Sequence, residues 1–438
     1  MDCSTLAQYR LGAFNCFSLA KDALMDVADA LLTETRAQTF VELSLAACFR
    51  RSWHSLYEAF QDGKIDRTKL KRLHIQYAPI SKNRNILIGD ASSMPRPHSK
   101  TGRDRGYVHM SNLPEGTKPV IAGWQFSNLV VAPEVTSSWT YTLSSERIPT
   151  DKTPCEMMAE QLSEAVPHID HRCLFLGDGG YGNIKFLIST KEIECDKLLR
   201  FGSNRNLYRE AEPRPEKPGR GRPSEDGKEF KCKFPETHGV PAEHWDGLDE
   251  KEKKIEVDRW DNLHFKEDRS IIVSLLRVTR HGAEGTKRDP KVVWFIFHGK
   301  ECPQLSEIPL IYSLRYSIEH GFRFEKQDLM WCSVRLHDPD RMQLWTDIVG
   351  CVRNQLYLAR SCGAVAHQPW ENKALPATPQ QVRRGMARII AMLGTPARPP
   401  QLRGKSPGLK KGSKNKPAKT YKVVYKSQKP SEEEKKAA

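Results

Sequence analysis

The sequence predicts an α/β protein with a mixed β-sheet at its centre. From residue 85 onward, apolar and β-branched runs alternate with amphipathic stretches in the order three strands, helix, strand, helix, strand. A later region of about a hundred residues is again rich in strand patterns, and helical patterns occupy both ends of the chain. Alternating strands and helices of this kind are typical of a sheet covered by helices.

The individual elements follow from local patterns. Strands are expected at 85–91, 120–133, 137–148, 172–177 and 195–204, with helices at 152–166 and 183–193 between them. After a Pro, Gly and Arg-rich loop at 212–230, three further strands are expected at 253–265, 270–280 and 291–299. Further helices are expected within 17–80 and at 311–329, 340–361 and 378–394.

These elements suggest five segments, which a chain of 438 residues is long enough to form. We expect a helical N-terminal region that is a candidate for DNA binding (1–82), the first part of a catalytic core (83–204), a β-rich insertion (205–300), the closing helices of the core (301–365), and a C-terminal helix followed by a basic, flexible tail (366–438).

The charge favours a polyanionic partner. The formal net charge is +15 and the sequence pI is 9.2. Residues 403–429 contain ten Lys or Arg and no acidic residue, so this tail holds most of the excess. A basic chain of this kind most simply binds nucleic acid.

Cysteine usage and hydropathy indicate a reducing compartment. The eleven cysteines include no C-x-x-C pair, which argues against a zinc ribbon and a disulfide scaffold. The N-terminus lacks a signal-peptide pattern, and no apolar stretch is long enough to span a membrane. We therefore expect a cytoplasmic protein without a membrane partner.

Three acidic residues are the candidates for chemistry. Asp90 and Asp178 each end a predicted strand, where side chains leave the core and face a ligand. Glu319 lies on the helix predicted at 311–329. Their hard oxygen donors suit Mg²⁺ or Mn²⁺, and two such ions can assist the attacking and leaving oxygens at a phosphorus. A single Asp at a strand end is more often a cap or turn residue.

The predicted helix at 311–329 also concentrates charge on one side. At about 100° per residue, Tyr312, Arg315, Glu319 and Lys326 fall within roughly 60° of one another. A carboxylate flanked by two cations suits a metal-bound, phosphate-bearing substrate. The alternative is an amphipathic surface helix with i,i+4 ion pairs. The apolar stripe beside the charged one contains Ile311, Leu314, Ile318, Phe322 and Leu329.

The spacing Y-x2-R-x3-E-x6-K of these residues resembles the YREK signature of DDE transposases encoded by bacterial insertion sequences. LIGDAS and FLGDGGYG resemble the first two acidic blocks of that superfamily. DASSMPRPHS, a GRGRP loop and PWENKALPATPQQVRRGMARII are similar to the seven-hundred-and-one group of insertion sequences, so the resemblance covers most of residues 45–425.

The resemblance implies a ribonuclease-H-like (retroviral-integrase-like) core. It implies that Asp90, Asp178 and Glu319 hold two Mg²⁺ ions, with Mn²⁺ able to substitute. Arg315 and Lys326 would grip DNA phosphates, and Tyr312 would contact a phosphate or position the terminal nucleotide.

The implied activity is cut-and-paste transposition in the bacterial cytoplasm, in association with the nucleoid. Water would free a 3′-OH at each transposon end, and that 3′-OH would attack target DNA. The partners would be double-stranded terminal inverted repeats and target DNA, bound by a homodimer or larger synaptic complex. Two alternatives stay open: a metal-dependent nuclease of the same core that performs no strand transfer, and a domesticated DNA-binding derivative.

Five further residues are possible DNA contacts. Arg220 and Arg222 of the GRGRP loop resemble a minor-groove hook, although a solvated linker fits equally. Lys410 and Lys411 belong to the basic tail, which can follow a DNA backbone. Trp260 would stack on a flipped nucleotide by resemblance to related enzymes, whereas core packing is the stronger alternative for an aromatic residue on a strand.

Overall fold

A computed structural model describes the parts of the chain on which the fold depends. They are residues 3–81, 83–110, 119–133, 137–211, 225–249, 252–282, 291–401, 412–413 and 417–425. The candidate DNA contacts Arg220, Arg222, Lys410 and Lys411 lie outside the described residues.

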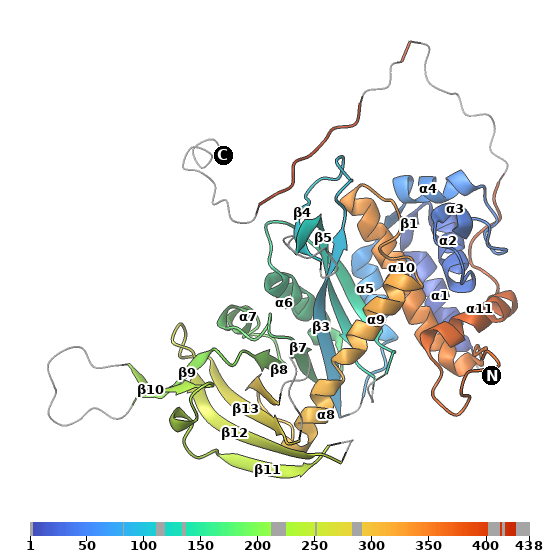
Figure 1. The fold of residues 1–438 in the computed structure, drawn as a ribbon. Helices are drawn as coiled ribbons and strands as arrows, with labels where there is room; N and C mark the ends of the chain where they lie inside the picture. Colours follow the sequence, from blue (N-terminus) through green and yellow to red (C-terminus); the bar gives the residue numbers. More distant parts are fainter. Residues whose placement is uncertain are drawn as a thin grey trace, which may run out of the picture.

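One continuous sheet runs through the described part of the protein. Its strands follow the order β10-β9-β12-β13-β14-β8-β7-β3-β5-β4, with β6 also paired to β5 and β11 to β12 (Figure 1). Strands β3, β7 and β8 are mutually parallel neighbours, whereas β5 and β6 are antiparallel additions beside β3. The strands are β3 (Arg84–Pro95), β4 (Gly106–His109), β5 (Val120–Val131), β6 (Tyr141–Ile148), β7 (Arg172–Gly177), β8 (Cys195–Phe201), β9 (Asn206–Glu210), β10 (Asp226–Lys231), β11 (Glu243–Leu248), β12 (Lys254–His264), β13 (Ile272–Arg280) and β14 (Val292–His298).

The helices lie on both faces of this sheet and beyond one of its edges (Figure 1). A short strand pair, β1 (Phe17–Leu19) with β2 (Lys64–Ile65), lies among the N-terminal helices. The helices are α1 (Ser4–Cys16), α2 (Lys21–Thr33), α3 (Phe40–Leu43), α4 (Trp53–Asp62), α5 (Arg67–Gln76), α6 (Pro154–Ala165), α7 (Ile184–Ser189), α8 (Ile308–Ser313), α9 (Tyr316–Gln327), α10 (Pro339–Leu358) and α11 (Pro379–Leu393).

The predicted order of the core elements is confirmed. Strands β3, β5 and β6 precede α6, β7, α7 and β8, and β14 returns to pair with β8. Helix α1, strands β4, β9, β10 and β11 and the β1–β2 pair were not predicted. The loop expected at 212–230 is wrong at its end, because β10 begins at Asp226 and pairs with β9. The single helix predicted at 311–329 is wrong, because two helices, α8 and α9, occupy this range. The five segment boundaries stay predictions.

Each face of the central sheet is covered by a different pair of helices. Leu87, Phe175 and Leu199 pack in one apolar cluster with side chains of α6 and α7. The neighbouring residues Ile88 and Leu176 pack in another cluster with side chains of α8 and α9. Since successive side chains of a strand point to opposite faces, this alternation fixes which residues face α9.

The N-terminal helices share a core with the C-terminal ones. Side chains of α2 and α4 pack in one apolar cluster with those of α10 and α11. Arg50 and Arg51, in the N-terminal region that is a candidate for DNA binding, lie 2.6 and 2.8 Å from the buried carboxylate of Asp26. These two cations therefore help to close the N-terminal region on itself.

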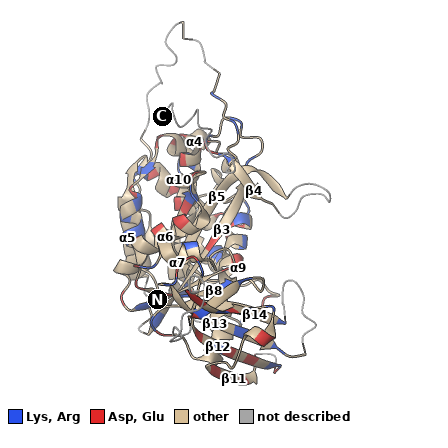
Figure 2. Cartoon of the chain, turned by 90° about the vertical axis from the view of Figure 1, so that its left-hand side faces the viewer, with Lys and Arg blue, Asp and Glu red and all other residues tan. Residues whose placement is uncertain are grey.

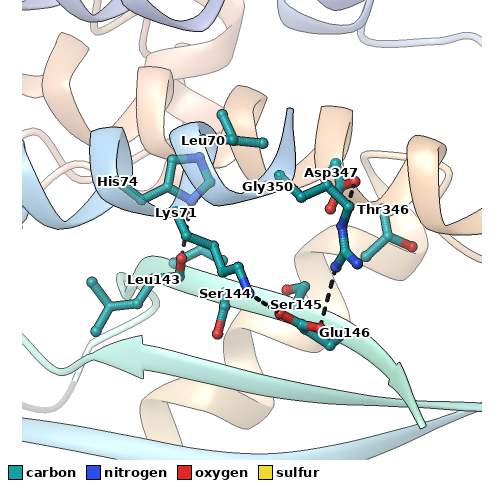
Figure 3. A pocket seen from close by; sticks show the side chains of 12 residues that line it. Leu70, Lys71, His74, Leu143, Ser144, Ser145, Glu146, Thr346, Asp347 and Gly350 are labelled. Carbon is teal, nitrogen blue, oxygen red and sulfur yellow. Dashed lines mark hydrogen bonds and ion pairs between the residues drawn. The ribbon is translucent and has the colours of Figure 1, made fainter. Parts of the chain in front are cut away.

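A partly buried charge cluster joins α5 to the core. Arg67 lies between Glu146 of β6 and Asp347 of α10, at 3.5 and 3.2 Å, and Lys71 lies 2.8 Å from Glu146 (Figure 3). Burial raises the pKa of Asp347 to about 6. The cavity between these side chains has a volume of about 10 Å³, which is room for roughly one water molecule. The cavity is therefore too small for a substrate, and the charge cluster has a structural role.

Charges on the outer strands are interspersed. Basic and acidic residues lie side by side on β12 and β13 (Figure 2). Arg277 of β13, for example, lies 2.7 Å from Asp258 of β12. A surface of alternating sign gives these strands no broad attraction for a polyanion.

Candidate active site

Asp90 and Asp178 lie side by side on one face of the sheet. Asp178 directly follows the last residue of β7, but the prediction that Asp90 ends its strand is wrong, because β3 continues to Pro95 through its pairing with β5. Strands β3 and β7 are parallel, and their register pairs Ile88 with Leu176. Asp90 and Asp178 each lie two residues after this pair. They are therefore level with each other, and their side chains lie on the same face as those of Ile88 and Leu176. That face is the one covered by α8 and α9.

A glycine before each aspartate lets the strands approach on the opposite face. A Cβ atom on Gly89 would lie 2.5 Å from Cε2 of Phe175 and 2.7 Å from Cε of Met158. A Cβ atom on Gly177 would lie 2.9 Å from Cδ2 of Leu199. The two Gly-Asp pairs therefore combine tight packing below the sheet with a carboxylate above it.

The environment of Asp90 disfavours its negative charge. Burial, and after it the charge of Asp178, raises the pKa of Asp90 from 3.8 to about 6, against the opposing charge of Arg315. One oxygen of Asp90 accepts a hydrogen bond from the Ala91 backbone at 2.7 Å. Asp178 accepts one from the Gly180 backbone at 2.8 Å, in the turn after β7. Both carboxylates are thus oriented while they repel each other.

Glu319 faces the two aspartates from the first turn of α9, with Arg315 between them. Arg315 Nη2 lies 2.5 Å from Glu319 Oε1, and Arg315 Nη1 lies 3.6 Å from Asp90 Oδ2. The Arg315 side chain is only 11% exposed, whereas that of Glu319 is 48% exposed. The structure therefore brings Asp90, Asp178, Glu319 and Arg315 together on one face of the sheet.

Tyr312 does not lie on the same helix as Glu319 and Lys326, as the single helix predicted at 311–329 required. It belongs to α8, whereas they belong to α9. Backbone bonds from Leu314 to Ile311 and from Arg315 to Tyr312 span three residues, which tightens the chain and separates α8 from α9. Tyr312 is buried, and its hydroxyl donates to the Gly177 carbonyl at 3.2 Å. Burial raises the pKa of this phenol. Tyr312 thus supports the strand end that carries Asp178.

Lys326 lies two helical turns after Glu319 on the same side of α9. Its Nζ atom lies 5.9 Å from the centre of the Phe322 ring. Among the described residues, no ion pair of Lys326 is found. Its charge is therefore available to an external anion.

Trp260 lies in the core, as the packing alternative predicts. Its side chain is 3% exposed and packs against Phe230, His238 and Trp294. Its indole N–H donates to the Gly239 carbonyl at 3.4 Å. The possible DNA contact by Trp260 is therefore not supported, because an indole with both faces packed cannot stack on a base.

Arg200 of β8 is a neighbour of the site that sequence reasoning missed. The β7–β8 register pairs Leu176 with Leu198, so Arg200 is level with Asp178 and on the same face. In the sequence, LLRFG reads as a strand with a terminal charge. Only the register reveals that this charge adjoins the acids.

The three acids have the donor chemistry that a divalent cation requires. Carboxylate oxygens are the ligands that Mg²⁺ and Mn²⁺ prefer, and a cation would relieve the repulsion between Asp90 and Asp178. As the described side chains stand, no group of three or more His, Cys, Asp or Glu could hold a metal ion. Arg315 is the cation that Asp90 and Glu319 contact. The donor chemistry of the acids therefore fits the ion, while the Arg315 guanidinium lies between Asp90 and Glu319.

A large open groove lies at the opposite end of β7 and β8. Its lining includes Arg172, Asp196, Lys197 and Lys300. Arg172 is paired with Asp196 at 2.8 Å, and Lys197 donates to the Thr190 carbonyl at 2.8 Å. Because these charges are satisfied internally, we do not place the chemistry there.

Residues 13–264 match the family model described as DDE superfamily endonuclease. The chain belongs to this family. No curated protein matches it. Members of the family act on DNA and are generally dependent on divalent metal ions. The matched residues include Asp90 and Asp178 and end before Arg315 and Glu319.

Membership in the DDE superfamily implies a ribonuclease-H-like fold, and the mixed sheet with helices on both faces agrees with it. Among the described residues, no helix combines the length and apolar character that a membrane span needs.

Proposed function

We propose that this DDE endonuclease is a transposase that cuts the ends of its element and joins them to target DNA. The observation that carries the proposal is the meeting of Asp90, Asp178 and Glu319 on one face of the sheet, with Arg315 between them. An acidic centre bordered by cations is what a phosphodiester undergoing transfer requires. The YREK spacing favours a transposase over a nuclease that only hydrolyses DNA.

In this proposal the carboxylates of Asp90, Asp178 and Glu319 hold two Mg²⁺ ions, for which Mn²⁺ can substitute. When bound, these ions supply charge neutralisation at the scissile phosphate and lower the pKa of the attacking hydroxyl group. The backbone N–H groups of Ala91 and Gly180 keep the two aspartates oriented. No side chain needs to form a covalent bond with DNA, because water and then the freed 3′-OH are the attacking groups.

Arg315, at the N-cap of α9, and Lys326, on α9, bind the substrate backbone in this proposal. Arg315 leaves Asp90 and Glu319 and donates to a phosphate near the cut, where its planar guanidinium can bind two oxygens at once. Lys326 acts as a second, point-like positive charge two turns away. Tyr312 keeps its bond to Gly177 and positions Asp178.

The biological setting follows from the same proposal. The enzyme acts on nucleoid DNA in the bacterial cytoplasm. Because two transposon ends must be held together, the active form is a homodimer or a larger synaptic complex on DNA.

The test uses the purified full-length protein with Mg²⁺ and a labelled duplex that carries the DNA bordering the gene. A duplex of the same composition in scrambled order is the matched control. We expect cleavage of the bordering duplex and joining of its 3′ ends to a plasmid, with neither product from the scrambled duplex. Cleavage of both duplexes without joining would indicate a nuclease. Binding without chemistry would indicate a domesticated DNA-binding derivative.

A further inference from the structure

We propose that Arg200 binds a DNA phosphate next to the one that is cut. The proposal rests on the transfer chemistry above, because it needs a DNA strand across the acidic residues. It adds a contact that neither the sequence motifs nor the family match assigns.

The register of two neighbouring strands places Arg200. On one side it is level with Asp178 of β7, and beyond that with Asp90 of β3. On the other side it is paired directly with Phe295 of β14. Paired residues of antiparallel strands share a face, and the Phe295 ring lies 4.4 Å from the Tyr312 ring of α8. Arg200 therefore faces the same side of the sheet as the acids.

No acidic partner of Arg200 is found in the part of the chain that the structure describes. The side chain is half-buried, and within the described ranges no ion pair or side-chain hydrogen bond of Arg200 is found. Arg172 of the sheet and Arg315 at the start of α9 differ in this respect, because Arg172 contacts Asp196 at 2.8 Å and Arg315 contacts Glu319 at 2.5 Å. A half-buried guanidinium retains its charge at every physiological pH and gains most from an external anion.

The spacing suits successive phosphates of one strand. Neighbouring strands of a sheet lie about 4.8 Å apart, so Asp90, Asp178 and Arg200 form a row across three neighbouring strands. A DNA strand whose scissile phosphate lies over Asp90 and Asp178 brings an adjacent phosphate toward β8. Arg200 would bind this phosphate with its fork of N–H donors.

The test compares full-length Arg200→Gln, Arg200→Lys and Lys185→Gln with the wild type. Lys185 is exposed on α7, on the opposite face of the sheet, so its substitution removes one positive charge away from the row. Affinity is measured by fluorescence anisotropy at a series of salt concentrations, with Ca²⁺ present. The probes are the bordering duplex and its scrambled counterpart.

We expect Arg200→Gln to weaken binding roughly tenfold on both duplexes and to reduce the salt slope by about 0.9, the value for one phosphate contact. Arg200→Lys should restore the slope but only part of the affinity, and Lys185→Gln should resemble the wild type. Thermal unfolding and Ca²⁺ binding should be unchanged in all four proteins. An unchanged slope, or an equal loss in Lys185→Gln, would overturn the proposal.

The result for Arg200 can be distinguished from the result for the proposed transposase function. If neither duplex is preferred and no joining occurs, the transposase proposal fails, yet the slope still reports whether Arg200 contacts a phosphate. If Arg200→Gln loses thermal stability while the slope is kept, Arg200 is a packing residue beside Phe295 and the inference is wrong.

Discussion

Arg315 Nη2 lies 2.5 Å from Glu319 Oε1, one helical turn further along the chain. The other terminal nitrogen of the guanidinium lies 3.6 Å from Asp90. A single cation of the chain therefore joins two residues that we propose to bind metal. Because Arg315 is also the proposed phosphate-binding residue, DNA that attracts this guanidinium would free the acids for the metal ion.

Arg315→Gln should raise the affinity of the DNA-free protein for Mn²⁺ several-fold, because it removes a competing cation from Asp90 and Glu319. The same substitution should weaken DNA binding. Isothermal titration with Mn²⁺ measures the first effect, and Arg200→Gln, which leaves the acids untouched, is the matched control. A weaker or unchanged Mn²⁺ affinity would show that Arg315 does not compete with the metal.

Metal binding should depend on pH through Asp90. The pKa of Asp90 is about 6, so the fraction of protein with this carboxylate ionised falls as the pH is lowered through 6. Mn²⁺ affinity at pH 5 should therefore be lower than at pH 7.5 by roughly tenfold. A titration series between these values tests this, and an affinity that declines only below pH 4 would contradict the elevated pKa.

Asp90→Asn should stabilise the metal-free protein at neutral pH. Raising the pKa from 3.8 to about 6 corresponds to a cost of roughly 3 kcal/mol for keeping the carboxylate charged in the folded state. This penalty is absent below pH 3.8 and complete above pH 6, so the difference between variant and wild type should grow as the pH rises. Urea unfolding with a chelator at pH 4 and pH 7.5 measures it. A destabilised variant at pH 7.5 would mean that the contact with Arg315 outweighs burial.

Gly321→Ala should destabilise the fold by about 1–3 kcal/mol. A Cβ atom there would lie 2.2 Å from Nη2 of Arg353, whose Nη1 forms a buried ion pair with Glu325 at 2.6 Å. This pair fastens α9, and hence Glu319, to α10. Chemical denaturation measures the loss. Gly179→Ala is the control, because no atom lies within 4 Å of its added methyl group; an equal loss in both variants would rule out the steric explanation.

Local patterns were sufficient to predict the core strands and the positions of Asp90 and Asp178. Apolar runs followed by Gly-Asp mark buried strands and a polar residue at the point where the apolar run stops, and this signal does not depend on distant partners. The continuation of β3 past Asp90 to Pro95 does depend on one, because these residues pair with β5. The break between α8 and α9 could not be predicted in the same way. Nothing in YSLRYS forbids a continuous helix, and the three-residue hydrogen bonds at Leu314 and Arg315 form where the chain packs onto the sheet.

Contacts between residues far apart in the chain also could not be predicted from the sequence. Arg67 and Asp347 are 280 positions apart, yet they form an ion pair at 3.2 Å. Arg200 became a candidate only because the register places it beside Asp178. A single sequence gives residue types and periodicity, whereas register and burial emerge from tertiary packing.

The most direct test of the central claim is DNA cleavage by the wild type, Glu319→Gln and Glu192→Gln in the presence of Mg²⁺ or Mn²⁺. Glu192 is exposed and lies beside the groove at the far end of the sheet, so its substitution is a matched loss of one carboxylate. If Asp90, Asp178 and Glu319 form the catalytic centre, Glu319→Gln should lose at least about a hundredfold in cleavage rate while it still binds DNA. Glu192→Gln should cleave like the wild type. Cleavage by Glu319→Gln at the wild-type rate would contradict the account.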